Sequence, residues 1–133
     1  MDKIIYKHND YIVYLLNEEM YICDYNKVRH FNMQTEDYYA ETMTNPKKMV
    51  DLNGNDIKFN DGRVIIYNDS MYIYGITKDA KLIVYTYKLD NYLSLPENIQ
   101  VNPIEFTKDI IGFDEYTSKY SIRLDIGEND KNI

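Results

Sequence analysis

Apolar and polar residues alternate in short runs along the first 25 residues, and this alternation predicts β-strands. The runs at 3–7, 11–16 and 20–25 are rich in isoleucine, valine and tyrosine, which favour extended backbone. The breaks between these runs contain asparagine and acidic residues, which are typical of turns. The pattern therefore predicts a three-stranded antiparallel meander.

The same kind of pattern is strongest between residues 63 and 89. Three apolar runs are separated by polar turns near 68–70 and 78–80, so this segment is predicted to form a second three-stranded antiparallel meander without a helix. Side chains alternate between the two faces of a strand. The apolar positions expected to be largely buried are Val64, Ile66, Ile73, Leu82 and Val84.

Two other segments have the pattern of short helices. Asn45 and Pro46 fit a helix cap followed by the first helical position. The same residue types recur at 102–103, with a glutamate two positions further on. The apolar spacing from 104 to 111 then favours a helix over a strand, with Gly112 as its end.

The fold class that these patterns predict is mainly β. Antiparallel meanders would form a small sandwich or an open barrel, with one or two short helices. Weaker patterns indicate a strand at 29–34 and a closing strand at 119–126. The length of 133 residues fits one domain. We expect this domain to span 1–126 and to be followed by a frayed tail at 127–133.

Residues 4–25 and 65–87 resemble each other. Each segment runs from Ile-Ile-Tyr through an Asn-Asp turn to a tyrosine-containing strand, a polar turn and a strand that ends in tyrosine. An internal duplication would explain the likeness. Two meanders of the same biased composition would also look alike, and this second explanation is favoured.

Tyrosine is abundant in the second meander. Tyr72 and Tyr74 share one face of their strand, and Tyr85 and Tyr87 share one face of the next strand. Both faces of this hairpin are thus apolar or amphipathic, so the core should cover one face, and a helix, a long loop or another molecule the other. The four tyrosines fit composition bias, a protein interface or a stacking site for a small ligand, and they are candidate partner-binding residues.

The chain carries 22 acidic and 15 basic residues, which gives a formal net charge of −7. Nucleic-acid-binding proteins normally have a basic surface because phosphate contacts supply much of the affinity. Direct nucleic-acid binding is therefore not expected, whereas a partner protein with a basic surface is compatible with this charge. No apolar run approaches the roughly 20 residues of a membrane-spanning helix. We expect a cytoplasmic protein that does not contact membranes.

The C-terminal third is the most acidic part of the chain and mixes carboxylates with apolar side chains. Acidic residues around aromatic ones would suit a basic groove of another protein. A solvated loop beside a core-facing element would have the same composition. The candidate partner-binding residues in this part are Asp109, Phe113, Asp114, Glu115 and Tyr116.

The patterns that indicate catalysis, metal binding or cofactor binding are not found. The segment 51–62 lacks glycine at the sixth position and glutamate at the twelfth, which an EF-hand requires. Cys23 lies in a predicted strand, where a buried apolar role fits better than a nucleophile. His8 and His30 do not form a metal-ligand spacing with Cys23. We therefore predict no enzyme activity, no cofactor and no metal site.

Size, charge and the missing chemistry favour a small acidic module that binds another protein. One version is an inhibitor of a nucleic-acid-handling protein, of the type that phages direct against host defence. A small-ligand-binding β-barrel and a structural subunit of an assembly are the alternatives. Homo-oligomerisation is compatible with all of these functions.

Overall fold

The computed structural model describes residues 1–8, 10–31, 34, 36–89, 100–104, 106, 108–118 and 121–130, without the side chains of Tyr87 and of 128–130. Ten strands and no helix occur in this part of the chain. The strands are β1 (Lys3–Lys7), β2 (Tyr11–Leu16), β3 (Glu19–His30), β4 (Tyr38–Lys48), β5 (Phe59–Tyr67), β6 (Ser70–Thr77), β7 (Leu82–Lys88), β8 (Gln100–Ile104), β9 (Lys108–Phe113) and β10 (Leu124–Asp130).

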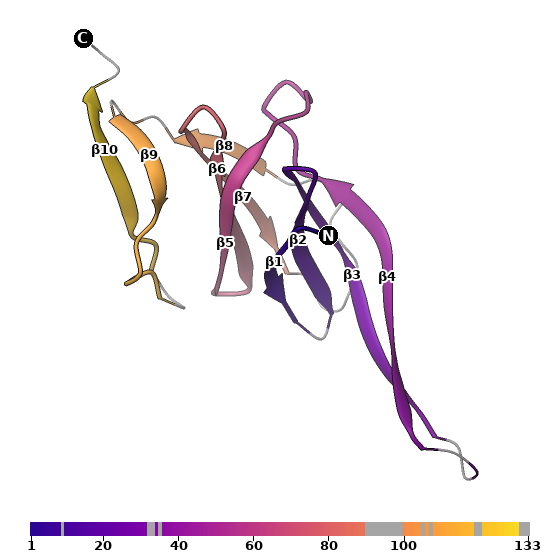
Figure 1. The fold of residues 1–133 in the computed structure, drawn as a ribbon. Coiled ribbons are helices and arrows are strands. Elements are labelled where there is room, and N and C mark those ends of the chain that lie inside the picture. Colours follow the sequence, from indigo (N-terminus) through magenta and orange to yellow (C-terminus); the bar gives the residue numbers. More distant parts are fainter. Residues whose placement is uncertain are drawn as a thin grey trace.

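The strands form three antiparallel sheets (Figure 1). Sheet 1 has the order β1-β2-β3-β4, sheet 2 has the order β5-β6-β7-β8, and β9 pairs with β10 in a separate hairpin. The meander predicted for residues 63–89 is confirmed. Its first turn is Asn68–Asp69, where both residues have positive φ, as the two-residue turns of hairpins require.

One apolar core draws its buried side chains from both four-stranded sheets. Alternate residues of β2 and β3 in sheet 1 and of β6 and β7 in sheet 2 belong to it, because successive side chains of a strand point to opposite faces. Its buried members are Tyr11, Val13, Leu15, Met20, Ile22, Met49, Phe59, Met71, Ile73, Ile83 and Tyr85. Of the five positions predicted to be buried, Ile73, Leu82 and Val84 are buried, while Val64 and Ile66 are half-buried and pack against this core.

The other face of sheet 2 packs against the β9–β10 hairpin. Ile76, Leu82 and Ile110 form a second buried cluster there, and Phe113 and Leu124 pack against it. The Ile110 amide donates a hydrogen bond to the Ala80 carbonyl at 3.0 Å. The predicted second cover of the tyrosine-rich hairpin is thus, at least in part, another hairpin rather than a helix.

The helix predicted at Asn45–Pro46 is wrong, because this segment lies inside β4. The register between β3 and β4 shifts there, so that β4 has one extra residue, which makes a β-bulge. Asn45 adopts a φ of 54° and its side-chain amide donates to the Asp24 carboxylate at 3.0 Å. Asn followed by Pro suits a bulge as well as a helix start. Proline has no backbone N–H to donate to the neighbouring strand, and a bulge interrupts the hydrogen bonds between the strands.

The helix predicted at 102–111 is also wrong. Pro103 lies in β8, opposite Ile83 of β7, and residues 108–113 form β9. Among the described strands, β8 pairs only with β7, so it is an edge strand in which the missing N–H of proline costs little. Gly112, predicted to end a helix, lies within β9.

Strand lengths also differ from the prediction in two places. β3 continues without a break to His30, so the separate strand expected from residue 29 is the end of a longer one. β10 starts at Leu124 and continues to Asp130. It therefore extends past residue 127, where the frayed tail was expected to begin.

The two similar segments both form three-stranded meanders with the same strand order. Their tight turns differ in position. In the first meander the two-residue turn Asn17–Glu18 joins the second strand to the third, whereas Asn68–Asp69 joins the first strand of its meander to the second. Internal duplication and shared composition both stay hypotheses for this likeness.

Candidate interaction surfaces

The distal part of the β3–β4 hairpin projects away from the rest of the molecule (Figure 1). We call residues 26–30 and 38–44 the arm, and the described residues between them, at 31, 34, 36 and 37, its tip. β2 pairs with β3 only as far as Asp24, so beyond this point the described partner of β3 is β4 alone. All residues of β3 from 26 to 30 are exposed, and so are those of β4 from 38 to 44 except the half-buried Ala40.

The arm exposes large apolar side chains that the body does not cover. Phe31 at the tip is 72% exposed, and Tyr38 and Tyr39 are 56% and 59% exposed. Val28 and Met43 are also exposed. Scattered apolar residues are normal on a protein surface, but a group of them on one narrow element marks a candidate binding site.

One face of the arm carries its ionic contacts. The register pairs Lys27 with Glu41 and Arg29 with Tyr39, which places these side chains on the same face. The Arg29 Nε donates to Asp37 Oδ2 at 3.1 Å, and the Lys27 Nζ lies 4.9 Å from the centre of the Tyr39 ring. We call this the charged face.

The opposite face of the arm has no Lys, Arg, Asp or Glu between residues 26 and 30 or between 38 and 44. We call it the apolar face. The His30 ring stacks on the Tyr38 ring with 4.8 Å between the ring centres. The residues of this face are Asn26, Val28, His30, Tyr38, Ala40, Thr42 and Thr44.

The apolar face continues the core-facing side of sheet 1. Met20 and Ile22 of β3 point into the core, and strand alternation directs Val28 to the same side of the sheet. Beside the core, sheet 2 covers this side, whereas along the arm the described residues leave it exposed. The arm therefore extends a packing face beyond the layer that covers it.

A hydrogen-bonded cluster fixes the base of the arm on its charged face. The Tyr25 hydroxyl donates to Glu41 Oε1 at 2.8 Å, and Lys7 Nζ donates to the same oxygen at 3.2 Å. These two hydrogen bonds lower the pKa of the Glu41 carboxyl. The pKa of Lys7 is raised by its hydrogen bonds with Tyr25 and Glu41. The cluster ties β1, β3 and β4 together where the arm leaves the body.

The candidate tyrosines of β6 and β7 do not form one surface. Tyr85 is 1% exposed, and its hydroxyl donates to the Val50 carbonyl at 2.7 Å, so it belongs to the core. Tyr72 and Tyr74 are half-buried on the opposite face of sheet 2, where Tyr74 packs against the cluster under the β9–β10 hairpin. Burial raises the pKa of both Tyr74 and Tyr85. The side chain of Tyr87 lies outside the described part.

The acidic candidates are divided between two places. Asp114, Glu115 and Tyr116 form a turn at one end of the β9–β10 hairpin, where Asp114 Oδ1 accepts a hydrogen bond from the Tyr116 amide at 2.8 Å and the Tyr116 side chain is exposed. Asp109 lies near the other end of β9. Phe113 faces sheet 2, with the Arg63 guanidinium 5.1 Å from its ring centre.

Asp125 of β10, which was not among the predicted binding residues, adds a carboxylate beside this turn. The pKa of Asp125 is raised, first by desolvation, then by a hydrogen bond with Asp114 and by the charges of Asp114 and Glu115. We call Asp114, Glu115, Tyr116 and Asp125 the acidic end.

A cavity of about 460 Å³ lies at one end of sheet 2. Its wall includes Leu82, Ile83 and Ile110, and its lining also includes charged residues such as Asp79 and Lys81. Thr77, a buried polar residue beside it, has its hydroxyl hydrogen-bonded to Asp79 and to the Lys81 amide. The cavity therefore offers apolar surface but no unsatisfied hydroxyl at Thr77 to orient a ligand.

The remaining candidate chemistry lies in ordinary structural surroundings. Cys23 is buried, and desolvation raises the pKa of its thiol to about 11, which disfavours the reactive thiolate. The His8 ring stacks against Tyr6 and Tyr11. Within the described residues, no group of three or more His, Cys, Asp and Glu side chains is arranged to hold a metal ion.

Comparisons with known proteins add no relatives: no family model, curated protein or solved structure matches this chain. In the described part of the chain there is no helix with the length and apolarity needed to cross a bilayer.

The arm residues were missed by sequence reasoning, although a signal was present. In the segment from Asn26 to His30, charged and uncharged residues alternate, and Tyr38 and Ala40 alternate with Tyr39 and Glu41. Alternation of this kind predicts a strand with two different faces.

Proposed function

We propose that this chain is a protein-binding module that engages its partner through the arm. The observation that supports this proposal is the exposure of Phe31, Tyr38 and Val28 on an element that the body does not cover. Aromatic side chains bring large contact area at a small cost in side-chain entropy, and they are enriched at interfaces. The two four-stranded sheets, which share one core, are proposed to form a sandwich that holds the arm in place.

The dimensions of the arm indicate the shape of the partner. Five residue pairs with a rise of about 3.4 Å, on two strands that are each about 4.8 Å wide, give the apolar face a flat area of roughly 160 Å². A stable interface buries about 800 Å² on each partner. The apolar face alone is too small, so the partner should be concave, with a cleft that also takes the tip and Phe31. An inhibitor that fills a functional cleft would have this geometry.

The test compares the intact protein with a variant whose arm is shortened. Replacing Val28–Ala40 with Asn-Gly leaves Lys27 opposite Glu41 across a two-residue turn, and it retains the Tyr25–Glu41–Lys7 cluster. Both proteins are immobilised and exposed to host lysate. We expect a partner to be retained in stoichiometric amount by the intact protein and to be lost with the shortened one. A partner retained equally by both, with the variant folded, would contradict the proposal.

The acidic end is a second candidate for the binding surface. Three carboxylates and an exposed tyrosine gather there, which suits a basic surface such as a nucleic-acid channel of a partner protein. The version in which this chain is a phage inhibitor of a host defence protein rests on this charge and on the net charge of −7. It stays a prediction, as does a cytoplasmic location.

A further inference from the structure

The outer edge of β4 carries main-chain groups that no described strand pairs with. β4 pairs with β3 along one edge, and sheet 1 ends there. Free strand edges bind other extended strands, so proteins guard them with bulges, proline or lysine. The base of β4 has all three guards, in the bulge at Asn45–Pro46 and in the following Lys47 and Lys48.

The arm part of β4 lacks these guards. Residues 38–44 read Tyr-Tyr-Ala-Glu-Thr-Met-Thr, with no proline, no glycine and one charged residue, Glu41. Tyrosine and threonine favour strands. The edge is thus guarded where β4 lies on the body and open where it forms the arm.

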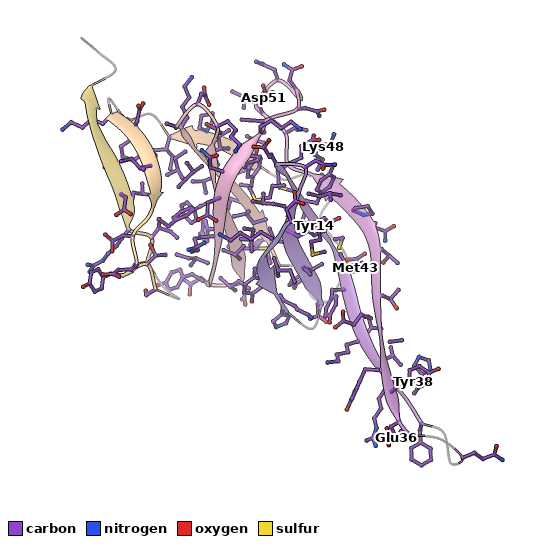
Figure 2. All side chains as sticks on the ribbon, in the orientation of Figure 1. Tyr14, Glu36, Tyr38, Met43, Lys48 and Asp51 are labelled. Carbon is purple, nitrogen blue, oxygen red and sulfur yellow. The ribbon has the colours of Figure 1, made fainter. Side chains whose placement is uncertain are left out.

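The charges of this strand suit antiparallel pairing with a copy of itself. Glu36–Asp37 precede the open segment and Lys47–Lys48 follow it. Figure 2 shows Glu36 near the far end of the arm and Lys48 at its base. In an antiparallel pair of copies centred on Thr42, the acidic end of each strand lies beside the basic end of the other. Opposite charges on neighbouring strands stabilise such pairs.

The centre at Thr42 also avoids a charge conflict. Counting outward from it, Glu41 of one copy lies opposite Met43 of the other. A pair centred on Glu41 would instead place two carboxylates directly opposite each other, which is destabilising. Threonine opposite threonine is a favourable cross-strand pair.

We propose that residues 40–44 of β4 pair antiparallel with the same residues of a second copy, with Thr42 on the two-fold axis. Such pairing joins two copies of sheet 1 into one continuous eight-stranded sheet and satisfies main-chain groups on both edges. It uses the edge and leaves both faces of the arm open, so it goes beyond the proposed function and does not depend on it. The net charge of −7 on each copy opposes association, but at 0.15 M salt its effect is screened beyond about 8 Å.

Cross-linking tests the register directly. Opposite residues in antiparallel strands have Cα atoms about 4.5–5.5 Å apart, which lies within the range of about 4.4–6.8 Å for disulfides. We therefore expect Thr42→Cys to give a disulfide-linked dimer under mild oxidation. The matched control is Asn26→Cys, which lies opposite Thr42 on β3, is also exposed, and is one strand removed from the proposed axis. It should stay monomeric, and the native Cys23 is buried.

Sedimentation velocity tests the association without a cross-link. The wild-type protein should shift with concentration from 15.9 kDa towards twice that mass. Thr42→Lys places two lysines opposite each other and should raise the dissociation constant about fivefold or more. Circular dichroism checks that each variant is folded. A wild-type protein that stays monomeric at every concentration overturns the proposal, as does equal cross-linking of the two cysteine variants. Cross-linking of Ala40→Cys or Thr44→Cys in place of Thr42→Cys overturns the register.

Discussion

The carboxyl group of Asp125 has a raised pKa because it is desolvated and lies beside Asp114 and Glu115. A raised folded-state pKa means that the protonated form is favoured on folding. The resulting stability is fully present below the unfolded-state pKa and is lost as the pH rises through the folded-state pKa. We expect Asp125→Asn to melt at a higher temperature than the wild type at pH 7, and the two to converge at pH 3. Thermal unfolding followed by circular dichroism across this range is the measurement.

Glu41 serves as a control, because its pKa is shifted in the opposite direction to that of Asp125. Its pKa is lowered by hydrogen bonds from Tyr25 and Lys7, so its contribution to stability is present above the unfolded-state pKa and is lost as the pH falls through the folded-state pKa. Glu41→Gln should therefore melt at a lower temperature than the wild type at pH 7 and approach it in acid.

Equal melting curves of wild type and Asp125→Asn at every pH would contradict the electrostatic account of the acidic end.

Among the elements, β6 has a glycine, Gly75, at a position where the side chains of Phe59 and Met20 leave no room for a Cβ. A Cβ at this position would lie 2.8 Å from the Met20 Cε and would overlap the Phe59 ring. We expect Gly75→Ala to lower the free energy of unfolding by about 1–3 kcal/mol, as overpacking of a filled core does. Urea denaturation measures this change.

Gly112 of β9 is the matched control for Gly75. A Cβ there meets no atom within 4 Å, so Gly112→Ala should change the free energy of unfolding by no more than about 0.5 kcal/mol. Equal losses for the two variants would show that glycine in a strand, rather than the close approach of Met20 and Phe59, sets the effect.

The sequence predicted the elements where alternation decides them and failed where capping patterns were used. The meander at 63–89 follows from its apolar alternation and its polar turns. The two helices were predicted from Asn followed by Pro, but this pair also fits a bulge in β4 and the edge strand β8. Local patterns alone do not distinguish these settings, because strand pairing with a distant segment decides between them.

The candidate sites were predicted less well, because their exposure depends on which element covers which face. Tyr85 was predicted as a candidate binding residue and lies in the core, whereas Tyr38 and Tyr39 of the arm were not predicted as binding residues and are exposed. Alternation indicates two faces of a strand. Alternation does not indicate how far the facing sheet extends, and the described part of sheet 2 does not cover the arm.

For the whole molecule, binding through the arm and binding through the acidic end predict different effects of charge reversal at the acidic end on partner association. Glu115→Lys with Asp125→Lys removes two carboxylates and keeps Asp114, whose side chain holds the turn. If the acidic end binds the partner, association should slow and its dependence on salt should weaken, because surface charges act mainly on encounter rates. Stopped-flow association with the captured partner at low and high salt measures this. An unchanged rate in the folded variant would exclude the acidic end as the binding surface.

The claim that the arm binds the partner through its apolar face is tested most directly by two neighbouring tyrosines. Tyr38 and Tyr39 are similarly exposed, lie on the same strand and point to opposite faces. Isothermal titration of the captured partner with Tyr38→Ser and with Tyr39→Ser compares the faces while the change in side chain stays the same. We expect Tyr38→Ser to weaken binding about tenfold or more, as the loss of an aromatic interface residue does, and Tyr39→Ser to weaken it by less than about threefold. Equal affinities for the two variants, or a larger loss for Tyr39→Ser, would contradict the account.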